Sequence, residues 1–91
     1  MGIGVKPQNK LDVNGTIHAR EVKVDLQGWA DYVFKKDYLL PTLEEVEKHI
    51  KEKGYLPGVP SEKEVLEKGI NLGDNQRLLL QKIEELTLYT I

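Results

Sequence analysis

The feature that most constrains this chain is a heptad pattern in its last stretch, Asn71 to Ile91. Six positions step by four and three residues along this stretch: Leu72, Gln76, Leu79, Ile83, Leu86 and Thr90. At about 100° per residue they fall in one narrow stripe of a helix about 30 Å long, the pattern of a coiled coil. We call this stripe the seam. Leu80 and Ile91 flank it on one side, and Leu78 and Tyr89 flank it on the other.

This apolar surface is too wide for one small domain to cover, so the seam predicts a helix that joins identical copies of the chain. The alternative is that the stripe packs on its own domain, because three heptads are the lower limit for a coiled coil. Two details favour association of identical copies over packing within one domain. Polar Gln76 and Thr90 are tolerated where they meet their symmetry mates and fix the register. The pattern also reaches Ile91 without a capping glycine, so we expect a longer helix in the parent protein.

Composition excludes several functions. The chain has 91 residues, 40% hydrophobic and 31% charged, which is typical of one small globular domain. A net charge of −2 offers no basic surface for nucleic acid, and no apolar run is long enough to span a membrane. There is no cysteine, so disulfides and thiolate metal sites are excluded. We expect no cofactor.

Residues 1–25 alternate apolar and polar side chains, as strands do. Asn14-Gly15 is a strong hairpin signal, so we expect a hairpin that joins the strand at Leu11 and Val13 to a strand from Ile17. The alternation slips by one residue at Arg20-Glu21, which predicts a bulge or bend. Such short strands either pair with other chains or form a self-contained meander.

Residues 26–70 hold most of the aromatic side chains. Two interpretations remain open for Trp29, Tyr32, Tyr38 and Tyr55. Exposed rings would form a platform for a sugar, whereas buried rings would fill the core of a small domain. We favour the core, with a helical turn over residues 30–34 that places Trp29, Tyr32 and Val33 on one face.

Two capping boxes predict two short helices in the same region. Thr42 with Glu45 begins the first helix, which Gly54 ends, and Ser61 with Glu64 begins the second, which Gly69 ends. The predicted buried side chains are Leu43, Val46 and Ile50 in the first helix, and Val65 and Leu66 in the second. Residues 55–60 contain two prolines and cannot be helical. Asn71 is the expected N-cap of the last helix.

No arrangement of residues suggests catalysis or metal binding. His18 and His49 lie on different elements without ligand spacing, and the only serine, Ser61, is explained as a helix cap. The carboxylates alternate with lysines on helix surfaces, and no nucleophile has a base beside it. We therefore expect a protein that is not an enzyme.

Three segments resemble the C-terminal region of tail-fibre-like proteins of Bacteroidetes and their phages. They are KLDVNGTIHAREVKV, the run from GWADYVFKKDYLLP to LPGVPSEKEVLEKGINLG, and LLLQKIEELTLYTI. The resemblance covers residues 4–91. It implies a structural module of a virion or injection system, extracellular or virion-associated, that ends a long β-structured fibre as a parallel homotrimer. A host-cell glycan or protein receptor is the further partner that it implies.

The middle segment is also distantly similar to the intramolecular chaperone domain of endosialidase-type tailspikes. In that family a Ser-Asp pair begins the domain, and the serine serves self-cleavage after trimer assembly. Ala30-Asp31 stands at the corresponding place here, without a hydroxyl group. The similarity therefore implies trimerisation or chaperoning without cleavage.

The sequence thus predicts an α+β fold in three parts. Residues 1–25 form a β-structured fibre-end segment, 26–70 a small α-rich cap with an aromatic core, and 71–91 an oligomerisation helix. The predicted function is trimerisation and registration of a tail-fibre-like protein, and the alternatives are a glycan- or receptor-binding tip or a cleavage-inactive chaperone. Isoleucine and leucine in the seam alone favour a dimer, so three copies depend on the resemblance and the wide apolar flanks.

Overall fold

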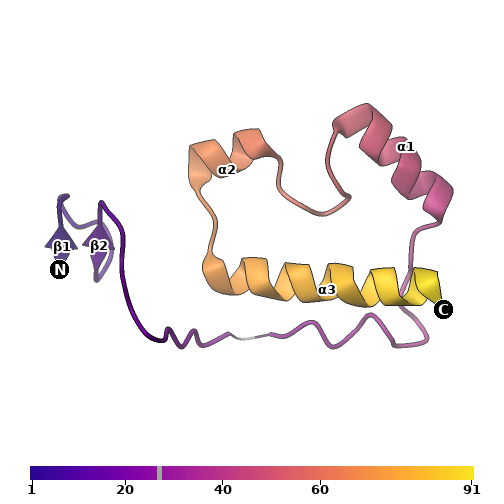
Figure 1. Cartoon of the computed structure of the whole chain (residues 1–91), viewed down its shortest axis with the longest axis horizontal. Helices are drawn as coiled ribbons and strands as arrows, with labels where there is room; N and C mark the ends of the chain where they lie inside the picture. Colours follow the sequence, from indigo (N-terminus) through magenta and orange to yellow (C-terminus); the bar gives the residue numbers. More distant parts are fainter. Residues whose placement is uncertain (27) are drawn as a thin grey trace.

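Helix α3, Leu72–Thr90, is the longest element of the fold, and the other segments lie along it. The computed structural model describes residues 1–26 and 28–91 and is an α+β chain. Four elements precede α3: strand β1 (Gly2–Ile3), strand β2 (Asp12–Val13), helix α1 (Leu43–Lys53) and helix α2 (Glu62–Lys68). Figure 1 shows α1 and α2 on one side of α3 and an irregular segment along the other side.

Both short helices begin and end where the capping residues predict. Thr42 accepts a hydrogen bond from the N–H of Glu45 at 3.1 Å, and Ser61 accepts one from the N–H of Glu64 at 3.3 Å. Gly54 ends α1 in the left-handed region at φ 84°, a conformation that glycine adopts without steric cost. Asn71 does flank α3, but its side chain makes no capping bond and donates to the Asp74 carboxylate instead.

Residues 24–26 and 28–41 run beside α3 in the same direction as the helix (Figure 1). Five residues of α3, spaced four apart, meet successive parts of this segment: Gly73 meets Leu26, Arg77 meets Gly28, Gln81 meets Tyr32, Glu85 meets Tyr38, and Tyr89 meets Pro41. Such a row is inclined at about 26° to the helix axis. The segment therefore crosses one face of α3 obliquely and reaches its C-terminal end, where α1 begins.

The absence of a side chain at Gly73 permits the closest of these contacts. A Cβ atom placed there would lie 2.5 Å from Leu26 Cδ2 and 2.8 Å from Val24 Cγ1. Both distances are shorter than van der Waals contact, so glycine is needed for the segment to lie this close to the helix.

The predicted hairpin at Asn14-Gly15 is wrong. Strands β1 and β2 pair in parallel, with Gly2 opposite Asp12 and Ile3 opposite Val13. A type I′ turn needs positive φ at both central residues, and neither Asn14 nor Gly15 has it. The chain instead turns earlier, at residues 8–12, and the second predicted strand, from Ile17, does not form.

The earlier turn is held by Asp12, whose carboxylate accepts hydrogen bonds from the Asn9 side chain and from the backbone N–H groups of Gln8 and Asn9. These donors lower the pKa of Asp12, the Asn9 side chain most of all. Residues 16–26 contain no strand and no helix. Of the predicted bulge or bend at Arg20-Glu21, the bend is present at Arg20, although no strand surrounds it.

The core is much smaller than predicted and is not aromatic. Among the described residues, the buried hydrophobic side chains are Ala30 and Val33, whereas Trp29 is 54% and Phe34 60% exposed. The predicted helical turn over residues 30–34 is replaced by hydrogen-bonded turns later in the segment, in which Lys35 donates to the Tyr32 carbonyl oxygen. The turns direct Val33 inward and Phe34 outward.

The predicted burial of the α1 and α2 stripes is also wrong for this chain. Leu43 and Ile50 are exposed and Val46 is half-buried, and neither helix contains a buried residue. In α2, Val65 is half-buried and Leu66 is 78% exposed. The connector of residues 55–60 is non-helical, as predicted. It places α1 beside α3 without packing the apolar stripe of α1 against that helix (Figure 1).

Replacing Gly73 with alanine tests the contact with residues 24–26. In a helix, this change ordinarily adds up to about 1 kcal/mol of stability. In G73A we expect the gain to be cancelled or reversed, because the new methyl group displaces Leu26 and Val24. Urea unfolding followed by circular dichroism measures the difference, and a gain of the full 1 kcal/mol would contradict the packing described here.

Candidate self-association surface

The seam lies on the one face of α3 that the chain leaves uncovered. Its four apolar side chains are about half exposed: Leu72 is 55%, Leu79 48%, Ile83 59% and Leu86 61% exposed. Gln76 and Thr90, the two polar members, are exposed as well. The structure thus places all six predicted residues together on one open face.

The other faces of α3 are covered by the same chain. Buried or half-buried residues occupy both flanks and the back of the helix: Gly73, Asn75, Arg77, Leu78, Leu80, Gln81, Lys82, Glu84, Glu85, Leu88 and Tyr89. The described residues of 24–41 lie along one flank, and the connector and the turn that follows α2 lie beside the other. Apart from Asp74 near the start of the helix and Thr87 beside the seam, the exposed residues of α3 are the six seam residues, so exposure largely follows the heptad pattern.

The whole molecule exposes more surface than a compact monomer does. A compact protein of 10.4 kDa exposes about 5400 Å², whereas this chain exposes 8217 Å², roughly 2800 Å² more. Its radius of gyration is 17.0 Å, against about 12 Å for a compact domain of this length. The excess is more than three times the roughly 800 Å² that each partner buries in a standard interface.

Glu85 is a buried carboxylate on the covered side of α3. It is 6% exposed, accepts a hydrogen bond from the Tyr38 hydroxyl at 2.9 Å, and pairs with Lys82 Nζ at 3.0 Å. Both partners satisfy a charge that would otherwise be costly to bury. The sequence analysis missed this cluster, because Glu85 follows Glu84 in what looks like an ordinary charged helix surface.

The environment of Tyr38 shifts its acidity. Burial, followed by the hydrogen bond to the Glu85 carboxylate and that group's negative charge, raises the pKa of the Tyr38 phenol to about 12. At neutral pH the phenol is therefore a stable hydrogen-bond donor. It fixes the segment to α3 at the level of Glu85.

The four candidate aromatic residues occupy two places. Trp29 and Tyr32 line a hollow of about 440 Å³ on the side of α3 away from the seam, and the Tyr38 ring lies 5.8 Å from that of Tyr32. Tyr55 packs edge-on against His49, with ring centroids 5.4 Å apart. Two of the rings thus line one hollow, while Tyr38 is half-buried and Tyr55 lies beside α1.

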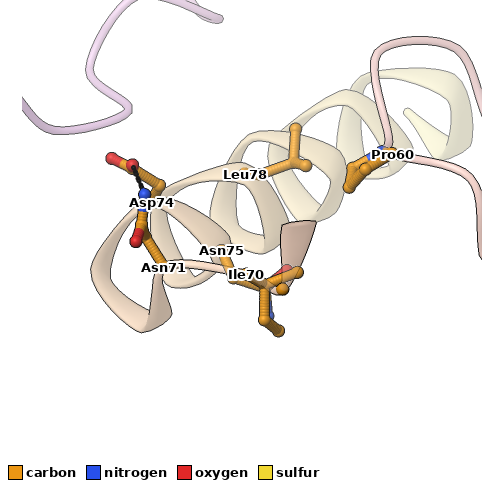
Figure 2. A pocket seen from close by; sticks show the side chains of 7 residues that line it. Pro60, Ile70, Asn71, Asp74, Asn75 and Leu78 are labelled. Atoms are coloured by element: carbon orange, nitrogen blue, oxygen red, sulfur yellow. Dashed lines mark hydrogen bonds between the residues drawn. The ribbon is translucent and has the colours of Figure 1, made fainter. Parts of the chain in front are cut away.

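A second hollow lies where α2 leads into α3 (Figure 2). Pro60, Ile70 and Leu78 give it an apolar wall. Its polar residues include Asn71 and Asp74, which bond to each other at 3.4 Å. The lining residues of this hollow include no nucleophile with a base beside it.

The histidines do not form a metal site with other residues. No group of three or more metal-ligating side chains occurs among the residues that the structure describes. Within residues 1–26 and 28–91, no helix is long and apolar enough to cross a membrane. Ser61 serves as the cap of α2, as its sequence context predicts.

Comparison with protein-family models, with curated proteins and with solved structures finds no match to this chain.

Tyr38 gives the covered side of α3 a measurable pH dependence. Its raised pKa means that the protonated phenol contributes its full stabilisation below about pH 10, and that this contribution is lost between pH 10 and about 12. We expect Y38F to be less stable at pH 7 by about 1.5–3 kcal/mol, because a bond to a charged group is lost. The unfolding free energy of Y38F should also change less than that of the parent between pH 10 and 12. If the unfolding free energies of the two proteins fell equally with pH over this range, the raised pKa of Tyr38 would be contradicted.

Proposed function

We propose that the chain is a structural module that joins identical copies in parallel through the α3 seam. The observation that carries the proposal is the coincidence of two patterns in one helix. Leu72, Leu79, Ile83 and Leu86 follow the heptad spacing, and they also form the open face of α3 while its other faces are covered. Burying the exposed half of each side chain contributes on the order of 1 kcal/mol.

Self-association also accounts for the shortage of core. Two buried hydrophobic side chains among the described residues are few for a chain of this length. Proteins that form obligate oligomers have no complete core in one copy, since the interface supplies the rest. The excess exposed surface of roughly 2800 Å² supports the same conclusion.

The role that we propose for the assembly is to set the register of the segments that precede α3. In each copy, contacts from Leu26 to Pro41 fix the segment before α1 against the α3 helix of the same copy. If the helices align in parallel, residues 16–25 of every copy leave the assembly at the same height. These segments would then meet in the same register, which they have no means of choosing by themselves.

We further propose that the copies number three and that the parent is a tail-fibre-like protein of an extracellular or virion-associated particle. The support for this part is the resemblance of residues 4–91 to the C-terminal region of such proteins.

A charge in the seam tests self-association. In I83D a carboxylate would be placed where copies meet, and we expect the dissociation constant to rise by at least about 100-fold. L66D is the matched control, because Leu66 is 78% exposed and lies on α2, away from the seam. Sedimentation equilibrium over a wide concentration range measures the dissociation constants of both variants. A parent chain that stays monomeric throughout would refute the proposal.

The orientation of the copies is testable with one cysteine, since the chain has none. In a parallel assembly, the residues at position 72 meet each other, so L72C should form an intermolecular disulfide on mild oxidation. In an antiparallel pair the two cysteines would be about 27 Å apart. The control is a mixture of the L72C and T90C variants. If the mixture forms a disulfide between the two variants while L72C alone forms none, the copies are antiparallel.

A further inference from the structure

An apolar hollow lies beside the seam, between α1 and the C-terminal half of α3. Its volume is about 230 Å³. Its walls are Leu43 and Val46 of α1, Leu56 and Pro57 of the connector, and Leu86 and Tyr89 of α3. The sequence predicts that the α1 stripe packs in the core of its own chain, whereas in the structure Leu43 and Val46 of this stripe line the hollow.

The polar groups around this hollow already have partners. Lys82 and Glu85 belong to its wall, but they pair with each other, and Glu85 also accepts the Tyr38 hydroxyl. The Tyr89 hydroxyl donates to the Pro41 carbonyl oxygen. An occupant of the hollow therefore needs to bring apolar groups and no polar group.

Helix α1 lacks the packing that a helix of its length needs. It has 11 residues, and isolated helices shorter than about 12–15 residues are marginal in water. None of its residues is buried, and Leu43 and Leu56 at the mouth of the hollow are 60% and 43% exposed. Within this copy of the chain, α1 therefore lacks the burial that stabilises a short helix.

We infer that the hollow receives a neighbouring copy, so that α1 and the connector form a second part of the interface. This inference rests on the proposed function. Leu86 belongs both to the seam and to the wall of the hollow, so a copy packed on the seam also reaches the hollow's mouth. The seam's four half-exposed side chains account for only a few hundred Å² of the excess surface, which leaves more to be covered.

Parallel packing identifies the part of the neighbour that enters. In a parallel coiled coil, the edge that carries Lys82 and Tyr89 faces the neighbour's edge that carries Leu80 and Thr87. The Thr87 hydroxyl donates to the Ile83 carbonyl oxygen of its own helix at 2.9 Å, so the methyl group remains for the contact. The hollow is larger than a cavity of about 150 Å³, which is enough for a benzene ring, so side chains of this size fit.

The L43E variant tests the second contact. Leu43 is the first residue of α1, where the helix dipole favours a carboxylate, so the change does not weaken the helix itself. A charge at the mouth of the hollow should raise the dissociation constant of the assembly by at least about tenfold. L66E, with the same change on exposed α2, should associate as the parent does. Sedimentation equilibrium gives the constants, and circular dichroism reports helix content.

The outcomes separate the two proposals. If the parent associates and L43E associates as tightly as L66E, the second contact is refuted while the seam stands. If the parent is monomeric at every concentration, the proposed function itself fails. L56E places the same charge in the opposite wall and outside any helix, so it decides the question if L43E loses helix content. An L56E variant that associates like the parent also refutes the second contact.

Discussion

The rest of the structure depends on one packing relation: a segment without regular structure lies along α3 and leaves one face of the helix free. The contacts from Leu26 at Gly73 to Pro41 at Tyr89 occupy a single inclined row of the helix. In the middle of this row, Tyr38 donates to the buried Glu85 carboxylate. These contacts orient the polar residues of α3 toward its own chain. The apolar seam on the opposite face therefore faces the outside.

This orientation reverses the usual arrangement of a surface helix, whose apolar face packs on its own core. Here the face that packs within the chain contains Arg77, Gln81 and Glu85, each in contact with the segment. Polar contacts of this kind are directional, so they fix the height of the segment along the helix more strictly than apolar packing does. Such fixing is what a module that sets register would need.

The exposed apolar surface continues from the seam to α1 through Leu86, which belongs to the seam and to the hollow next to it. In our proposal, the marginal stability of α1 and the small core of one copy have the same physical cause, an apolar surface that further copies cover. In our proposal, assembly and completion of the fold are one process.

The sequence by itself determined the local elements. The caps at Thr42 and Ser61, the glycines after α1 and α2, and the heptad spacing in α3 act within a few residues, so their positions were predictable. It did not determine what each apolar stripe packs against. Leu43 of α1 and Leu79 of the seam carry equivalent signals for burial, and the structure leaves both exposed.

Tertiary contacts decided the remainder. The hairpin at Asn14-Gly15 does not form, and Asp12–Val13 pairs instead in parallel with Gly2–Ile3, ten residues earlier in the chain. The burial of Glu85 depends on its hydrogen bond with Tyr38, which is 47 residues away in the sequence. No local sequence pattern predicts a partner at that separation. Short-range preferences thus specify where helices begin and end, whereas the face that a helix turns toward its own chain depends on groups that only folding brings together.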